Sequence, residues 1–240
     1  MIRTAIIAAM PAELKPLTRG WHHERSNGVH LWRWSFDEGE WIAACAGAGF
    51  AAATRAFAEI EKSGEADKLI STGWAGALRE ELAPGQVRDV STVIDARTGE
   101  RFVTACPPSD CWLVTSPKVA DKTEKQRLAA TYEAALVDME AAGVARLARM
   151  RGIPFYCIKG ISDGYSDQLP DFNRFISSDG QFKLARFVFF VLLRPWHWRA
   201  LIRMGENSKK AARTIAASLL DLLDERGNIR KRNAYPNQKR

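Results

Sequence analysis

The sequence contains little cysteine and little histidine, four of each in 240 residues. The cysteines are Cys45, Cys106, Cys111 and Cys157, and they show neither a CxxC spacing nor a neighbouring cluster of histidines. We therefore expect no zinc site and no other metal or cofactor, and we interpret the cysteines as reduced thiols of a cytoplasmic protein. The chain is 46% hydrophobic and 26% charged, which is ordinary for a globular protein, and a core of this size needs no disulfide to fold.

The sequence also lacks an apolar run long enough to cross a bilayer. The run Ala5–Met10 is too short for the core of a signal peptide and predicts a buried first strand. The segment Phe182–Leu193 contains ten aliphatic or aromatic residues, but Arg186 interrupts it, and Arg194 and Pro195 follow it directly. Since a spanning helix needs ~20 apolar residues, we expect this segment not to cross a membrane.

The excess of positive charge belongs to the C-terminal end. The formal net charge is +7, and six basic residues but no acidic residue follow Glu225, so the rest of the chain is near +1 (7 − 6). We interpret 226–240 as a disordered, solvated basic tail and expect no specific nucleic-acid site. The six residues are Arg226, Arg230, Lys231, Arg232, Lys239 and Arg240.

Strand-like and helix-like apolar patterns alternate along the chain. This alternation predicts an α/β three-layer sandwich with a central mixed, largely parallel sheet. We expect one domain over 1–225 with an apolar and aromatic insertion at about 180–205. The segment 86–97 is rich in β-branched residues but shows no clear strand boundaries. The expected strands are 4–9, 29–36, 41–46, 68–72, 112–115, 135–138 and 154–159, and the expected helices are 12–17, 47–62, 124–132, 140–151 and 207–224.

Five short segments fall at or just after the ends of these expected strands. They are Met10–Glu13, Gly47–Gly49, Gly73–Gly76, Met139–Glu140 and Ser162–Asp163. Ligands of such sheets bind at the carboxyl ends of the strands, in the loops that follow. We therefore expect these segments to converge on one binding site.

Two carboxylates in these segments are candidates for acid–base work. Asp163 follows an apolar strand, where burial could keep a carboxylic acid protonated near neutral pH. The alternative is an Asx turn or a helix N-cap, which an aspartate after a strand often provides. Glu13 is a candidate base, and its alternative is an exposed glutamate favoured by the helix dipole.

Several motifs in a fixed order resemble those of the nucleoside phosphorylase and nucleosidase superfamily. Val137–Ala142, Ile153–Phe155 and Lys159–Asp163 read VDMEAA, IPF and KGISD, similar to the family's VEMEA, VPF and RAISD. The opening Ile6–Glu13 resembles the GIIGAMEEE start of methylthioadenosine/S-adenosylhomocysteine nucleosidases. Gly47–Ala53 aligns with the family's Gly-x-Gly-x-x-Ala-Ala motif, and Ser71–Gly76 aligns with its NTGSAGG motif. Thr115–Lys125 aligns without a gap with the family's purine-stacking loop.

The resemblance implies cleavage of the bond between a purine and its ribose. Asp163 would protonate purine N7 and Ser162 would hold the purine edge. Glu140 would accept hydrogen bonds from both ribose hydroxyls, Met139 would pack against the sugar, and Glu13 would orient or deprotonate an attacking water. The remaining substrate-binding positions that the alignment implies are Met10, Ala75, Gly76 and Val119.

The sequence departs from the family pattern at several positions. Trp74 replaces the serine of NTGSAGG, which contacts phosphate in phosphorylases, and an indole cannot take that role. Val119 stands where the nucleosidases carry the phenylalanine that stacks on the base. Lys159 keeps the charge of the family's arginine but loses its planar fork. The interval from Gly76 to Val137 is also shorter than in the nucleosidases, so part of the usual pocket wall is expected to be missing.

The insertion at 182–204 has a composition that suits a membrane interface. Trp196, Trp198, Arg199 and Arg203 follow its apolar half, a mixture typical of a headgroup boundary. The alternative is a helix buried in the core or in a dimer interface. Together with the VDMEAA motif, the insertion resembles the branch associated with hopanoid biosynthesis, whose members act on adenosylhopane. This resemblance predicts peripheral contact with the inner face of a membrane.

These observations leave three functional hypotheses. The first is hydrolysis of a purine nucleoside, on a soluble or a lipid-linked substrate such as adenosylhopane. The second is phosphorolysis, with phosphate bound by groups other than Trp74. The third is a membrane-surface nucleoside-binding protein without turnover, which the replacements at Trp74 and Val119 keep open. We expect a homo-oligomer in each case.

Overall fold

The computed structural model describes residues 2–37, 39–167, 171–177, 180, 182–183, 187 and 198–225. Most of the insertion and the whole basic tail lie outside these residues, so the predicted domain boundaries stay predictions. The strands are β1 (Ile2–Ala8), β2 (His22–Ser26), β3 (Val29–Phe36), β4 (Gly39–Cys45), β5 (Lys68–Ala77), β6 (Val87–Asp89), β7 (Thr92–Asp95), β8 (Arg101–Val103), β9 (Trp112–Thr115), β10 (Leu136–Asp138) and β11 (Phe155–Asp163). The helices are α1 (Pro11–Leu14), α2 (Phe50–Glu61), α3 (Lys122–Tyr132), α4 (Ala141–Arg151), the 3-10 helix η1 (Phe172–Phe175) and α6 (Trp198–Glu225).

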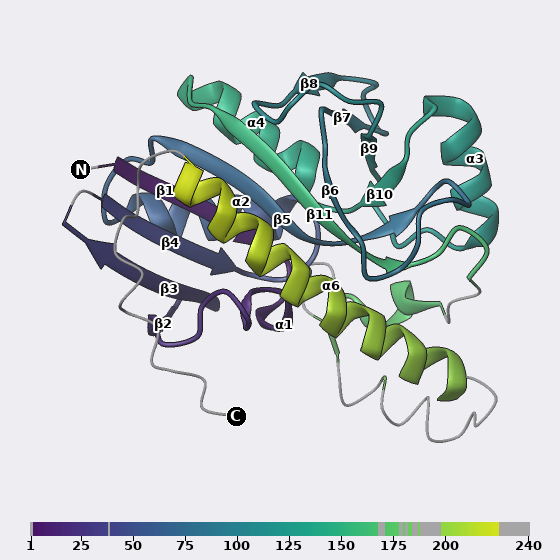
Figure 1. Cartoon of the computed structure of the whole chain (residues 1–240), viewed down its shortest axis with the longest axis horizontal. Coiled ribbons are helices and arrows are strands. Elements are labelled where there is room, and N and C mark those ends of the chain that lie inside the picture. Colours follow the sequence, from purple (N-terminus) through teal and green to yellow (C-terminus); the bar gives the residue numbers. More distant parts are fainter. Residues whose placement is uncertain are drawn as a thin grey trace.

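The strands form a single sheet in which β5 is the branching strand (Figure 1). The order is β2-β3-β4-β1-β5-β10-β9-β7-β8, and β11 pairs with β5 and β6. Strands β4, β1, β5 and β11 run parallel, as do β10, β9 and β7. Antiparallel pairs occur towards the edges and between β5 and β10. The end of β5 therefore lies between the start of β10 and the end of β11, where the family motifs were expected to meet.

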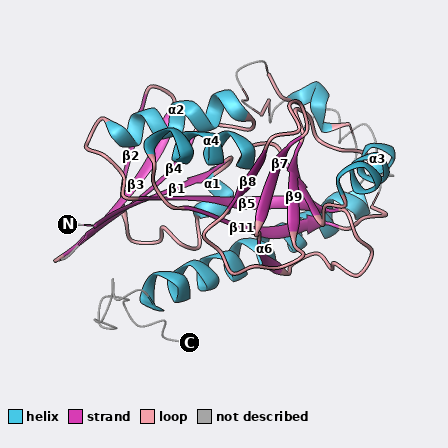
Figure 2. Ribbon diagram, turned by 90° about the horizontal axis from the view of Figure 1, so that it is seen from above, coloured by secondary structure: helices cyan, strands magenta, loops and turns pink. Residues whose placement is uncertain are grey.

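The helices cover both faces of the sheet (Figure 2). Helices α2 and α4 lie on one side and α6 on the other. Strand β1 shows the reason, because its side chains alternate between the two faces. Ala5 and Ile7 pack with α2 and α4, whereas Ile6 and Ala8 pack with α1 and α6. Both faces are apolar, so the sheet must be covered twice, and the predicted three-layer α/β sandwich is confirmed.

Helix α6 begins earlier than the sequence pattern predicted, at Trp198 rather than 207. Its C-terminal half packs on the sheet through Ala211, Ile215 and Leu219, which recur at helical spacing and are fully buried. The start of the helix is more exposed, with Trp198 45% and Ile202 61% exposed. The apolar periodicity of the sequence therefore located only the second half of the helix, which packs on the sheet.

The sequence pattern also missed four short strands, β2, β6, β7 and β8. Strand β2 is entirely polar, HHERS, and shows no apolar alternation. It exists because each of its residues pairs with β3, so its position depends on a neighbouring strand rather than on its own residues. In the described part of the chain, no helix is both long and apolar enough to cross a membrane.

Candidate active site

Glu13 lies buried at the junction of β1, α1 and β5. One carboxylate oxygen accepts the amide hydrogens of Ala9 and Met10, at 2.8 and 2.7 Å. The other accepts that of Trp74 at 2.7 Å. Burial raises the pKa of Glu13, although the bond from Trp74 opposes this shift most strongly. The side chain is only 4% exposed, so the alternative of an exposed helix-start glutamate is wrong.

Gly73 makes this arrangement possible. Its φ of +115° is one that side-chain-bearing residues rarely adopt, and a Cβ there would lie 2.6 Å from Glu13 Oε1. The glycine of the Ser71–Gly76 motif therefore brings the backbone of β5 against the Glu13 carboxylate.

Glu140 reaches across the site to the loop before α2. Its Oε1 accepts the amide hydrogen of Gly49 at 2.7 Å. Glu140 is free to do this because Asp138, not Glu140, caps α4: Asp138 Oδ2 accepts from the amide of Ala141 at 2.9 Å. Burial, followed by the neighbouring charge of Asp138, raises the pKa of Glu140 to about 8.

Lys159 is the buried cation of this cluster. Its Nζ lies 2.9 Å from Asp138 Oδ2 and donates to the carbonyl of Thr72 at 3.0 Å. Burial is the largest single influence and lowers the pKa of Lys159, but the charges of Asp138, Cys157 and Glu140 and the hydrogen bond to Asp138 together outweigh burial and raise it. Glu13 and Glu140 also lie within the electrostatic influence of this lysine, which opposes the rise in the pKa of each.

Asp163 ends β11 beside Gly76 and is held by two side chains. Ser162 Oγ donates to its Oδ1 at 2.5 Å, and Lys125 Nζ from α3 contacts its Oδ2. Both partners are buried, and a Cβ on Gly76 would lie 2.9 Å from Asp163 Oδ2. Asp163 does not act as a helix N-cap in these contacts, because both of its carboxylate oxygens accept hydrogen bonds from side chains.

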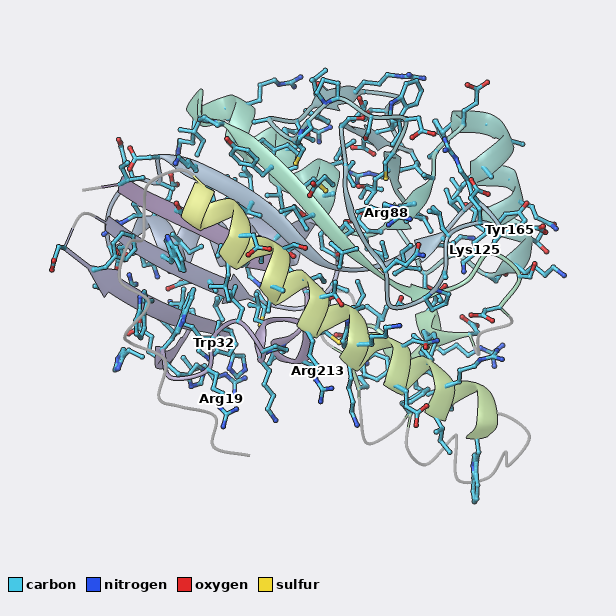
Figure 3. The ribbon with its side chains drawn as sticks, in the orientation of Figure 1. Arg19, Trp32, Arg88, Lys125, Tyr165 and Arg213 are labelled. Atoms are coloured by element: carbon cyan, nitrogen blue, oxygen red, sulfur yellow. The ribbon has the colours of Figure 1, made fainter. Side chains whose placement is uncertain are left out.

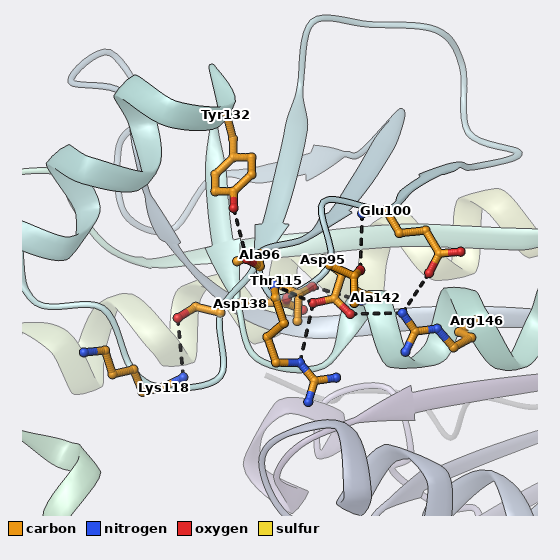
Figure 4. Close-up of polar contacts among 12 residues, drawn as sticks. Asp95, Ala96, Glu100, Thr115, Lys118, Tyr132, Asp138, Ala142 and Arg146 are labelled. Carbon is orange, nitrogen blue, oxygen red and sulfur yellow. Dashed lines mark hydrogen bonds and ion pairs between the residues drawn. The ribbon is translucent and has the colours of Figure 1, made fainter.

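A cavity of about 420 Å³ opens at Gly49, the residue that donates to Glu140, but Glu13, Glu140 and Asp163 are not among its lining residues. Of the predicted residues, Met139 lines it directly. One wall is a polar network at the start of α4 (Figure 4), in which Thr115 Oγ1 donates to Asp138 Oδ1 at 2.8 Å and accepts from the amide of Ala142 at 2.9 Å. The other lining residues are Ala48, Gly49, Phe50, Ala51, Asp95, Arg97, Thr115, Ser116, Pro117, Lys118, Ala142, Gly143, Asn173, Ile176, Ser177 and Gly180.

Val119 is not among the residues that line the cavity. Its amide donates to Asn173 Oδ1 at 2.8 Å, and its carbonyl accepts from Asn173 Nδ2 at 3.0 Å. The loop instead presents Pro117 and Lys118 to the cavity. Asn173 thus ties the expected purine loop to the segment after β11, and the sequence pattern gave no sign of this contact.

Met10 and Ala75 take part through their backbones. The amide of Met10 holds Glu13, and the carbonyl of Ala75 lies 3.3 Å from Ser162 Oγ. The segments Met10–Glu13, Gly73–Gly76 and Ser162–Asp163 are therefore joined by hydrogen bonds, and the Gly47–Gly49 loop is joined to Glu140. In the described residues, no group of three or more His, Cys, Asp or Glu side chains could hold a metal ion.

Trp74 directs its indole away from the carboxylates. Indole Nε1 donates to the carbonyl of Ser208 in α6 at 3.0 Å, while its backbone amide binds Glu13. Both nitrogens of Trp74 are thus used within the fold.

A sequence model described as the phosphorylase superfamily matches residues 3–111 and 112–188, more than half of the chain. The chain belongs to the phosphorylase superfamily. The resemblance drawn from the motifs is thereby confirmed at the level of the superfamily. No curated protein matches this superfamily member in sequence.

Solved structures share the fold of this phosphorylase-superfamily protein at low identity. A 5′-methylthioadenosine/S-adenosylhomocysteine nucleosidase from Helicobacter pylori is 18% identical with a TM-score of 0.71, over 94% of this chain and 99% of that chain. The Arabidopsis thaliana 5′-methylthioadenosine nucleosidase is 15% identical with a TM-score of 0.73, over 96% and 98%. Futalosine hydrolase of Helicobacter pylori is 17% identical with a TM-score of 0.70, over 93% and 98%.

The sequence pattern missed Lys125 as a functional candidate. Only its position in the predicted helix pointed to burial. Lys125 stands three residues before Leu128, so the two side chains lie on the same face of that helix. Leu128 is fully buried, and so is Lys125. A lysine on the buried face of a helix indicates a buried acidic partner, which the structure identifies as Asp163.

Proposed function

We propose that this protein hydrolyses the N-glycosidic bond of a purine nucleoside. Asp163 would protonate N7 of the leaving base, Glu13 would take a proton from the attacking water, and Glu140 would bind the ribose hydroxyls. Met139 would pack against the sugar, with Ser162 and the backbones of Ala75 and Gly76 beside the base.

The preference for water over phosphate depends on the contact between Glu13 and Trp74. In the phosphorylases that the chain resembles, position 74 is a serine that contacts phosphate. Here the Trp74 amide binds Glu13 and its indole binds α6. A buried carboxylate would repel a phosphate anion, whereas its raised pKa makes it a stronger base toward water.

The proposed step balances without a cofactor. A water oxygen bonds to ribose C1′ while the bond from C1′ to the purine nitrogen breaks, and the bonding electron pair leaves with the base. The proton of the water goes to Glu13, and the base receives a proton at N7 from Asp163. The products are free ribose, or its substituted form, and a neutral purine.

A lipid-linked nucleoside such as adenosylhopane is our finer proposal for the substrate. The composition of the insertion, in which tryptophans and arginines follow an apolar run, favours contact with a lipid. Soluble adenosine derivatives are the alternative substrates, and peripheral membrane contact, like the homo-oligomeric state, stays a prediction.

Purine release with and without phosphate tests the proposed reaction. The purified protein is incubated with adenosine, 5′-methylthioadenosine and a lipid-linked adenosine in detergent, and free adenine and the sugar product are quantified. We expect adenine release at the same rate with or without phosphate, and a sugar without phosphate. A strict phosphate requirement with a sugar 1-phosphate product would show phosphorolysis instead. Binding without release from any nucleoside would favour the non-catalytic hypothesis.

A further inference from the structure

Lys125 is one of the most deeply buried charged side chains among the described residues. It lies on the inner face of α3 with its side chain 1% exposed (Figure 3). Its Nζ contacts Asp163 Oδ2 and donates to the carbonyl of Gly164 at 2.7 Å. The lysine therefore binds both the proposed acid and the residue that follows it.

This pair is poorly explained as a device for stability. Removing a lysine and an aspartate from water costs nearly as much free energy as their attraction returns, and well-packed apolar residues often do as well. The space around the pair is also restricted, since a Cβ on Gly76 would lie 2.9 Å from Asp163 Oδ2 and 3.1 Å from Lys125 Cε. The backbone at Gly76 therefore packs directly against both side chains of the ion pair.

The contact changes how Asp163 can act as an acid. Lys125 Nζ donates a hydrogen bond to Asp163 Oδ2, so a proton lies between the two groups. A proton that Asp163 gives to a leaving base can be replaced along this hydrogen bond. The ammonium of Lys125 is therefore in position to resupply the carboxyl group.

We propose that Lys125 supplies, through Asp163, the proton that the leaving base receives. This inference rests on the proposed glycosidic cleavage and makes Lys125 a positioning residue for Asp163. As negative charge develops on the base, a proton moves from Lys125 Nζ to Asp163 Oδ2, and the carboxyl proton moves to purine N7. The pair then consists of a neutral amine and a carboxylate, and it recovers one proton from solvent after the base departs.

Other charged groups near the pair already have partners. On α3, Glu124 pairs with Arg127 at 2.7 Å. After β11, Asp167 accepts from the amide of Gly164 at 2.8 Å and pairs with Arg203 of α6 at 3.1 Å.

Tyr165 follows Gly164 in the same loop, and Asp138 of the neighbouring β10 is paired with Lys159. Because these neighbouring charged groups are paired with other residues, we assign the proton that reaches the base to the hydrogen bond between Lys125 and Asp163.

Three lysine variants separate proton supply from charge and from packing. Lys125→Arg keeps the positive charge but cannot release a proton near neutral pH. Lys125→Met keeps an apolar stem and removes the charge. Lys122→Met, at an exposed position of the same helix, is the matched control. For each variant, kcat and KM for purine release are measured from pH 5 to 10, together with Tm.

We expect Lys125→Arg to lower kcat by about 10²- to 10³-fold, the usual worth of one proton transfer, with KM within about threefold of the unmodified protein. In Lys125→Met, Asp163 must retain its own proton, so the basic limb of the kcat profile should move to lower pH by more than about one unit. A riboside of 4-nitrophenol, whose leaving group departs without a proton, should be cleaved at similar rates by all variants. Lys122→Met should change none of these values.

Wild-type kcat in Lys125→Arg would overturn the proposal, because charge alone would then suffice. An unmoved basic limb in Lys125→Met, with only Tm lowered, would show a structural role and would overturn it as well. If the unmodified protein cleaves no nucleoside, the proposed function fails, but the proton coupling can still be measured. The ¹³C signal of the Asp163 carboxyl should then titrate differently in Lys125→Met and in the unmodified protein, and identical titrations in both would overturn the coupling.

Discussion

Glu13, Asp138 and Glu140 are three buried carboxyl groups that share the single cation of Lys159. Such an excess of acid can be buried only if one carboxyl retains a proton. Glu140 is that group, and its pKa of about 8 compares with an ordinary value of 4.5. If Glu140 binds the ribose as proposed, binding depends on the protonation of this side chain.

The raised pKa of Glu140 predicts how stability depends on pH. The folded protein binds this proton more tightly than the unfolded chain, so its contribution is fully present below pH 4.5 and is lost as pH rises to about 8. Glu140→Gln keeps an acceptor for Gly49 but does not ionise. We expect Tm to fall less between pH 5 and pH 8.5 in this variant than in the unmodified protein. Glu65→Gln, at an exposed position, should retain the original slope, and an equal slope in Glu140→Gln would refute the assignment.

The proposed acid is tested by Asp163→Asn. An amide can accept from Ser162 but cannot pass on a proton, so kcat for purine release should fall by about two to four orders of magnitude. Binding of a substrate analogue should change much less. Asp110→Asn is the matched control, because Asp110 also pairs with a cation, Arg79 at 2.8 Å, but is exposed. Near-normal turnover in Asp163→Asn would remove this residue from the mechanism.

At the scale of elements, β11 and α6 pack closely at one glycine. A Cβ on Gly160 would lie 2.8 Å from Ile215 Cδ1 and 2.9 Å from Ala211 Cβ. Gly160 lies three residues before Asp163, so the distance between α6 and the sheet also sets where the end of β11 lies. Trp74 adds a second link from β5 to the same helix.

This close packing predicts the effect of enlarging Gly160. Gly160→Val should destabilise the fold by about 1–3 kcal/mol through overpacking, which lowers Tm by several degrees for a chain of this size.

Gly205→Ala in α6 is the opposite case, since nothing lies within 4 Å of its added Cβ. It should raise stability by about 0.5–1 kcal/mol, because alanine favours helix over glycine. Thermal unfolding measures both, and an unchanged Tm in Gly160→Val would mean that α6 yields at this contact.

At the scale of the whole molecule, the start of α6 contributes apolar side chains to the surface. Trp198 and Ile202 are exposed, and Arg203, the residue after Ile202, pairs with Asp167. The preceding part of the insertion and the basic tail lie outside the described residues. The composition of both segments predicts attachment to an anionic membrane surface.

A flotation assay with anionic liposomes tests this attachment. We expect the intact protein to float at low salt and to be released by high salt, since each basic residue near the surface adds on the order of 1 kcal/mol and salt screens it. A chain ending at Glu225 should bind more weakly, and Trp198→Ser with Ile202→Ser should weaken binding further. Protein that stays unbound at low salt would make a soluble adenosine derivative the better substrate hypothesis.

The sequence alone determined the superfamily and the fold class of this protein. Apolar periodicity located the long helices and the central strands, because both faces of the sheet must be covered. The glycine-rich and acidic motifs at strand ends made Glu13, Glu140 and Asp163 candidates, since such motifs are local in sequence. Short polar strands such as β2 were missed, because pairing with a neighbour creates them.

Only the tertiary structure decided which charged and polar groups of the candidate site lie next to one another. Lys125 is 38 residues from Asp163, and Trp74 is 134 residues from Ser208. No local pattern relates such positions, because their contact depends on how α3 and α6 pack against the sheet. Whether a buried carboxyl holds a proton depends on which cation the fold places beside it, and for that reason the sequence could name Asp163 as a candidate acid but not Lys125 as its neighbour.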